Sequence, residues 1–170
     1  MFNIAENTKV VNVAAPADFS GGAMTTEWIS MENATKATFL LSIGALSASS
    51  AVITLNVADD ITPTHSATAA ASMDLPFEYY YKSGALPSDT FTKTTVSSST
   101  FTLSKSTDDN RVLAIEVKAA EMGQFTDTSV YDAKYVRLAM ANPSASCFGS
   151  CVCILTGLRY QSDSPPTAIL

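Results

Sequence analysis

Apolar side chains alternate with other side chains along several segments of this 170-residue chain. The pattern is clearest in segments 37–44, 51–60, 111–119 and 134–142, where Ile, Leu, Val, Phe or Met recurs at every second position. Successive side chains of a strand point to opposite faces of a sheet, so a period of two predicts a strand with one buried face. The four segments are therefore predicted to be half-buried strands.

Weaker alternation predicts further strands at 9–13, 26–30, 77–82, 90–96 and 100–104. The last two are predicted to form a hairpin across the serine run between them. Many short strands separated by polar or Gly- and Pro-containing segments are typical of β-sandwiches and jelly rolls. We therefore predict an all-β, single-domain β-sandwich or jelly roll with long loops and extended termini.

The length of the chain is enough for one sizeable core but short for two. Residues 1–160 are predicted to form the sandwich domain, and residues 161–170 an extended C-terminal arm. Segments 15–28 and 58–76 are predicted to be long surface loops. The Ala-rich part of the second, 64–76, is predicted to be either a short helix or a loop.

Helix signals are otherwise few. Segment 118–125, KAAEMGQF, is predicted to form a single helical turn closed by Gly123. Strands do not alternate with helices along the chain, which argues against a doubly wound α/β sheet.

Uncharged hydroxyl and methyl side chains replace charges over much of the chain. Charged residues make up 15%, whereas the chain has 21 Ser, 20 Thr and 24 Ala. Such a surface suits β structure and broad contact with other subunits, because few charges have to be desolvated on association.

The net charge of −6 argues against a nucleic-acid partner, because that affinity comes from clustered Lys and Arg, and the ten basic residues here are scattered. No run approaches the ~18 apolar residues of a membrane span, so we expect no membrane partner. The first residues lack the basic and apolar regions of a signal peptide.

The three cysteines, Cys147, Cys151 and Cys153, have the spacing C-x3-C-x-C. On a strand, Cys151 and Cys153 point the same way, which is a poor geometry for a disulfide between them and for tetrahedral zinc. We predict free cysteines that line one buried face of a strand. An odd number of cysteines also fits a reducing compartment.

Catalytic signatures are weak. His65 is the one histidine and follows Asp59 and Asp60, but this is not a known metal-ligand spacing, and we predict a polar loop. No G-x-S-x-G motif occurs, so a serine nucleophile of that type is not indicated. The remaining combination for nucleophilic catalysis is Cys147 or Cys151 acting with His65.

Adjacent carboxylates, including the pair at 108–109, are typical of turns and not of an acid and a base across a cleft. There is also no P-loop and no dinucleotide fingerprint. We expect no enzyme activity, no cofactor and no metal.

Aromatic residues cluster in segment 77–82. Alternation places Phe77, Tyr79 and Tyr81 on one face of the predicted strand, with Tyr80 on the other. These three aromatic side chains could form a core-facing cross-strand ladder, a subunit interface or a platform on which sugar rings stack. The sequence does not decide between these three roles.

The arm at 161–170, QSDSPPTAIL, does not continue a central strand, because Pro165 and Pro166 lack donors and favour a polyproline-type path. Such a segment is either disordered or bound along a neighbour. The contacts expected of the arm are Pro165, Pro166, Ile169 and Leu170.

The order of features in YDAKYVRLAMANPSAS and VCILTGLRYQSDSPPTAIL resembles small virion proteins of tailed bacteriophages, of the capsid decoration or cement type. The matching parts are a strand KYVRLAMANPSA, a strand ending ILTGLRY and a closing SPPTAI arm, about a third of the chain, and VVNVAAPADFSGG near the N-terminus is compatible.

The resemblance implies a β-sandwich, commonly a homotrimer, that caps junctions between shell subunits and braces the shell against genome pressure. The implied partner is the major capsid protein, and the implied location is the capsid surface of the virion, after assembly in the host cytoplasm. It implies no catalytic residues. Two alternatives stay open: a tail, fibre or baseplate component, and a small carbohydrate-binding module that uses Tyr79 and Tyr81. A hydrolase using Cys151 or His65 is least favoured.

Overall fold

The computed structural model describes residues 7–20, 22–46, 51–60, 65–68, 77–82, 91–96, 100–103, 105, 110–126, 129–141 and 147–159. In chain order the elements are β1 (Thr8–Asp18), β2 (Met24–Thr25), β3 (Ile29–Ser30), β4 (Lys36–Leu46), β5 (Ala51–Ala58), β6 (Ser66–Thr68), β7 (Phe77–Lys82), β8 (Phe91–Val96), β9 (Thr100–Leu103), β10 (Arg111–Lys118), α3 (Ala119–Met122), β11 (Gln124–Thr126), β12 (Val130–Asp132), β13 (Tyr135–Met140) and β14 (Cys147–Thr156).

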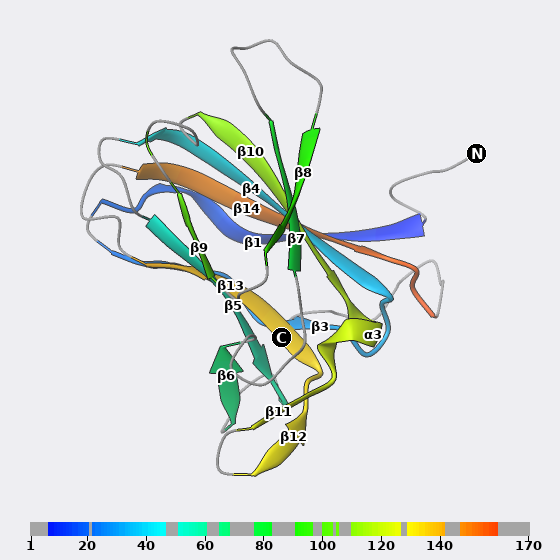
Figure 1. The fold of residues 1–170 in the computed structure, drawn as a ribbon. Coiled ribbons are helices and arrows are strands. Elements are labelled where there is room, and N and C mark those ends of the chain that lie inside the picture. The colour runs from blue at the N-terminus through cyan, green and yellow to red at the C-terminus, as the bar shows by residue number, and fades with distance from the viewer. Residues whose placement is uncertain are drawn as a thin grey trace.

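Two antiparallel sheets form the molecule. The larger has the strand order β1-β14-β4-β10-β7-β8, and Figure 1 shows its first four strands running side by side. The second sheet has the order β2-β13-β5-β6, with β3 also pairing with β13 and β9 with β5. The β11–β12 hairpin is a small separate sheet at the lower end of the view. The predicted all-β sandwich is confirmed.

The core lies between the buried faces of the two sheets. The four clearest sequence patterns are confirmed as β4, β5, β10 and β13, and in each of them the predicted apolar residues are the buried ones. The largest buried side chains include Phe39, Leu41, Ile53, Leu55, Leu113 and Ile115. Each side chain of this size stabilises the fold by about 1.5–3 kcal/mol when it leaves water.

The prediction of one long loop at 15–28 is wrong. Strand β1 continues to Asp18, and β2 follows at Met24–Thr25. Its pairing with β14 shifts register between Asn12 and Ala14 and again between Ala14 and Ala17. These irregularities and the position of β1 at the sheet edge accommodate Pro16, which has no amide hydrogen to donate.

The predicted hairpin between segments 90–96 and 100–104 is wrong. β8 pairs with β7 in the larger sheet, whereas β9 pairs with β5 in the second sheet. The serine run between them therefore connects two sheets instead of two paired strands.

Two other segments differ from the sequence prediction. Residues Ser66–Thr68, expected in a helix or loop, form β6, which pairs with the end of β5. In the predicted strand 26–30, only Ile29–Ser30 is a strand. The amide of Thr26 donates to the Leu138 carbonyl at 2.9 Å, but the Leu138 amide donates to the Thr26 hydroxyl at 3.0 Å, so a side chain replaces a backbone partner there.

The short helix α3 and its end at Gly123 are as predicted. Gly123 has a φ of 55°, in the left-handed region that glycine adopts without a steric penalty. The strands β11 and β12 that follow were not predicted from the sequence.

Gly157 ends β14 with a φ of 63°, and a Cβ there would collide with the side chain of Thr35. The Thr35 hydroxyl donates to the Thr156 carbonyl at 3.1 Å, which holds it in place. We predict that Gly157→Ala lowers the free energy of unfolding by about 2 kcal/mol or more, through backbone strain and this collision. Urea unfolding measures the loss.

Gly22→Ala is the matched control, because nothing lies within 4 Å of a Cβ at Gly22. This variant is expected to stay within about 0.5 kcal/mol of the parent. Equal stabilities of the two variants would contradict the role given to Gly157.

Candidate interaction surface

The outer face of the larger sheet is apolar across its central strands. Val152 on β14 lies opposite Leu40 on β4, and Leu40 lies opposite Ala114 on β10. These half-buried side chains form a row across three strands. In the next row Val10, 54% exposed, lies opposite Ile154.

By register, Lys93 on the edge strand β8 and Asp18 opposite Phe148 lie on this face. A further pair of charges lies at the end of the sheet where β4 begins. Lys36 and Glu116 point outward there and pair with each other, with 2.7 Å between Nζ and Oε1. Because the two charges are partly exposed, the pair contributes little to stability. The centre of the face therefore has apolar and hydroxyl side chains as its main contact groups.

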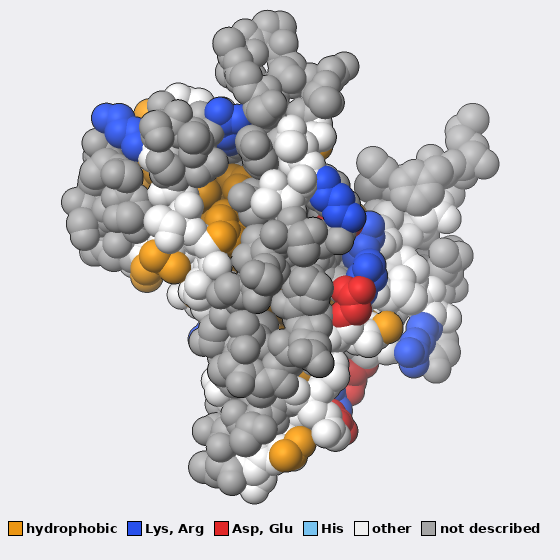
Figure 2. Space-filling view, in the orientation of Figure 1, with side chains coloured by type: hydrophobic (Ala, Val, Ile, Leu, Met, Phe, Trp, Pro, Cys, Tyr) orange, Lys and Arg blue, Asp and Glu red, His pale blue; other side chains and the backbone are white. Residues whose placement is uncertain are grey.

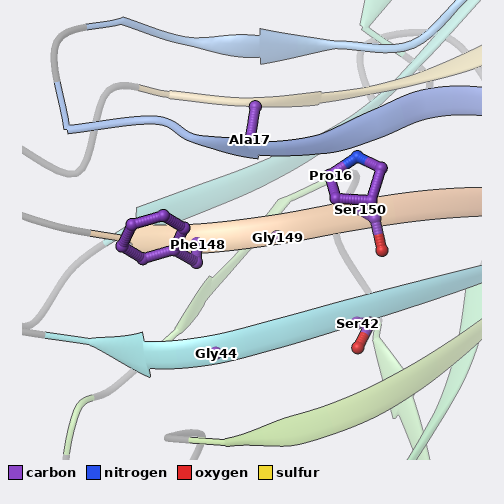
Figure 3. Close-up of a pocket in the computed structure, with 7 residues that line it drawn as sticks. All are labelled: Pro16, Ala17, Ser42, Gly44, Phe148, Gly149 and Ser150. Atoms are coloured by element: carbon purple, nitrogen blue, oxygen red, sulfur yellow. The ribbon is translucent and has the colours of Figure 1, made fainter.

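A shallow pocket of 340 Å³ lies on the same face, where β1, β14 and β4 run side by side. Its lining residues are Pro16, Ala17, Ser42, Gly44, Phe148, Gly149 and Ser150. Figure 3 shows the rings of Pro16 and Phe148 toward opposite ends of the pocket, with Gly149 on the strand between them. None of the lining residues is charged, so the pocket suits an uncharged, apolar ligand.

Irregular strand pairing builds this pocket. The register shifts in β1 bring Ala17 opposite Gly149 and Asp18 opposite Phe148. Alternation along β14 places Phe148 on the outside, where it is 57% exposed, and Cys147 in the core. The register shift against β4 leaves two residues, Gly44 and Ala45, opposite Phe148, so β4 bulges beside its ring.

Gly44 permits the position of Phe148. A Cβ on Gly44 would lie 3.3 Å from both the Cβ and the carbonyl oxygen of Phe148, closer than an ordinary contact. The sequence analysis missed this pocket, although an aromatic residue between two inward-facing cysteines was a signal for it.

The three cysteines are free and buried on the core side of β14, as predicted. Burial raises the pKa of the Cys151 thiol to about 12, and burial together with the neighbouring Cys151 raises the pKa of Cys153. Among the described residues, no group of three or more His, Cys, Asp or Glu side chains is arranged to hold a metal ion.

His65 does more than the predicted polar loop suggests. Its Nδ1 lies 3.0 Å from Asp59 Oδ2, and its ring stacks on Tyr131 at 3.9 Å between centroids, with 17° between the ring planes. Asp59 Oδ1 is buried and has no hydrogen-bond partner. The contacts join the end of β5, the start of β6 and the middle of β12, so the arrangement is a structural clasp between three elements.

Arg137 on the outer side of the second sheet stacks over Trp28, with Cζ 4.2 Å from the ring centroid. Burial lowers the pKa of this guanidinium, while the charge of Glu27 partly opposes the shift. This contact was also not foreseen from the sequence.

Several predicted site residues lie outside what the structure describes. The backbone of β7 places Tyr79 opposite Ile115 and Tyr81 opposite Leu113, but the side chains of β7, including Phe77 and Tyr80, are outside the described part. The aspartates at 108–109 and the arm at 161–170 are also outside it. The arm contacts Pro165, Pro166, Ile169 and Leu170 therefore remain predictions.

Lys and Arg side chains do not form a continuous surface on the face shown in Figure 2. They lie in separate patches among the described residues, several of them beside acidic side chains near α3. None of the described helices has the length and apolar character needed to cross a bilayer.

No protein-family model matches the chain. No curated protein matches it either.

Among solved structures, the chain is similar to the structure of infectious bursal disease virus Gt strain, with 11% identity, a TM-score of 0.24, and coverage of 87% of this chain and 38% of that one. The structure of the Gx strain has 12% identity, a TM-score of 0.24, and coverage of 87% of this chain and 40% of that one. The crystal structure of the VP2 subviral particle of this virus has 11% identity, a TM-score of 0.21, and coverage of 87% of this chain and 39% of that one. The chain thus spans about two fifths of the length of these solved chains. At such TM-scores the likenesses carry no argument about its function.

The buried thiols predict a pH dependence of stability. Between the ordinary thiol pKa of 9.0 and about 12, Cys151 ionises in the unfolded chain but stays protonated in the folded one. The stability from this difference is complete below pH 9 and is lost as pH rises toward 12. We expect a loss of about 1.4 kcal/mol per pH unit for each such thiol, measured by urea unfolding under reducing conditions between pH 8 and 11.

The double variant Cys151→Ala with Cys153→Ala is the control for this prediction. Its stability is lower below pH 9 because of the two small cavities, and its decline above pH 9 should be shallower. An unchanged slope would assign the decline to other groups.

Proposed function

We propose that this chain is a structural virion protein that binds the outside of a phage capsid and stabilises the shell by bridging neighbouring capsid subunits. The partner is the major capsid protein, and the protein acts as a homo-oligomer, with a trimer as the expected form. The resemblance of the C-terminal third to decoration proteins supports this assignment.

The observation that carries the proposal is the outer face of the larger sheet. A sheet face in contact with water usually alternates to polar residues, yet here Leu40, Val152 and Ile154 lie on the outside of the central strands. A contiguous apolar surface of this kind marks a contact with another macromolecule. Because the described residues of β14 and β4 at the centre of the face are uncharged, their burial has a small desolvation cost.

The mechanism follows from mass action. A protein that binds only the assembled shell adds its binding free energy to that assembly, and occupancy at many symmetric sites raises resistance to rupture. The two packed sheets supply the rigid body that such a brace requires.

The proposal is for a non-catalytic protein. The thiol of Cys151, one of the two cysteines considered as a nucleophile, is buried and remains protonated at neutral pH. A protonated thiol is a poor nucleophile, so this residue is unsuited to covalent catalysis. His65 is engaged with Asp59 and Tyr131 in the clasp between β5, β6 and β12.

Copy number in purified particles tests the proposal. We expect quantitative mass spectrometry to give a ratio to the major shell protein near one or a fixed simple fraction. A handful of copies per particle would instead indicate a tail, fibre or baseplate component. Absence from particles would remove the virion role altogether.

The outer face is tested by Val10→Glu, which places a charge on that face at an exposed position. Desolvation of the new carboxylate should weaken attachment to particles by about tenfold or more, with little loss of folding stability. Co-sedimentation of the purified protein with particles that lack it measures the occupancy. Val130→Glu on β12 is the matched control, because Val130 is 61% exposed and lies far from this face. Equal occupancy by both variants would exclude the face as the binding surface.

A further inference from the structure

We propose that the pocket between Pro16 and Phe148 binds the Pro165–Pro166 segment of the arm of a second copy of this chain. The inference concerns contacts between copies in solution and does not depend on the virion role. The pocket lies at the beginning of β14, whereas the arm follows the end of this strand in the sequence, and this separation decides which copy supplies the arm.

The chemistry of the pocket matches that segment. Proline-rich segments bind shallow apolar grooves in which aromatic rings pack against the pyrrolidine rings, with little ordering entropy to lose. Phe148 provides the aromatic ring, Pro16 adds an apolar pyrrolidine ring, and Gly44 and Gly149 leave the sheet between them open. The lining residues carry no charge, and the side chains of residues 164–170 carry none, so docking of the two prolines desolvates no charged side chain.

Pro165 and Pro166 follow a part of the chain that lies too far from the pocket of the same chain for these prolines to occupy it. Thr156 pairs with Lys36 at the first residue of β4, and the Arg159 amide donates to the Asn33 carbonyl at 3.0 Å, beyond that end of the strand. The pocket is lined by Ser42 and Gly44, six and eight residues along β4 from Lys36, so its near and far sides lie about 20 and 26 Å from that end of the strand.

The first proline of the arm falls short of the centre of this pocket. Six residues separate Arg159 from Pro165, and a fully extended chain covers about 20 Å in six residues. Pro165 therefore does not reach the centre of the pocket in its own chain, even if the arm runs straight back along the sheet. The prolines that occupy the pocket belong to another copy.

The distance between the pocket and the start of the arm also determines how the copies are arranged. An arm that leaves one end of the sheet and docks at the other end of a neighbour makes a head-to-tail contact, which closes as a ring when the rotation between copies allows it. A trimer, the form implied by the resemblance, is one such ring.

Cross-linking of two single variants tests the contact. Ala17→Cys places a thiol beside the pocket, Ser164→Cys places one beside the prolines, and each variant is made in a separate full-length chain. The three natural cysteines are fully buried and do not compete for cross-linking. The introduced thiols are therefore the ones that react. A docked arm holds the two thiols at a millimolar effective concentration. With an added disulfide oxidant that accepts the two electrons and two protons, the mixed disulfide at micromolar protein should form at least about tenfold faster than with Val130→Cys in place of Ala17→Cys.

Two further variants separate docking from chance encounter. Phe148→Ser, and Pro165→Ala combined with Pro166→Ala, should each reduce the cross-linking rate to that of the Val130→Cys control, while thermal unfolding verifies that the sandwich is intact. Sedimentation of the parent should show an oligomer that these variants weaken. Equal rates for Ala17→Cys and Val130→Cys, or a parent that stays monomeric at every concentration, would overturn the proposal.

Discussion

Burial of one face of β4 and β14 is the constraint on which the rest of the structure depends. Both strands have neighbours on each side, β14 between β1 and β4 and β4 between β14 and β10. A slip of one residue would move Phe39, Leu41, Cys151 and Cys153 into solvent and disrupt most of the core, so the register of the larger sheet is strongly specified. The remaining residues of these strands are then obliged to face outward.

Those outward positions explain why the outer face of the larger sheet carries apolar side chains. Hydroxyls occupy some of them, but Leu40, Val152 and Ile154 occupy others, and the register places Leu40 directly beside Val152. The edge of the sheet is protected differently: the register shifts and Pro16 in β1 interrupt the row of backbone groups that another strand would need for pairing. The architecture thus favours contact through the face of the sheet over contact through this edge.

The cysteines and His65, which were considered as reactive groups, instead take part in packing and in contacts between elements of the fold. The cysteines fill the core side of β14, and their raised pKa values are a consequence of that burial. His65 and Asp59 are held by each other and by the ring of Tyr131, which fastens the β11–β12 hairpin to the end of the second sheet. The sequence brought His65 and Asp59 to attention through proximity, but it contained no indication of Tyr131, 66 positions further along the chain from His65.

Local pattern alone determined the all-β class, the four best strands, the buried cysteines and the turn of α3, because strand alternation and a glycine helix end are properties of neighbouring residues. Only the tertiary structure decided that β8 and β9 belong to different sheets, that β1 continues through Pro16, and that Pro16 of β1 and Phe148 of β14 line one pocket. Pairing between distant strands depends on which arrangement buries the most apolar surface at once, and a bulge depends on the partner strand. Neither is encoded in the period of a single segment, so the candidate surface appeared only when the sheets were assembled.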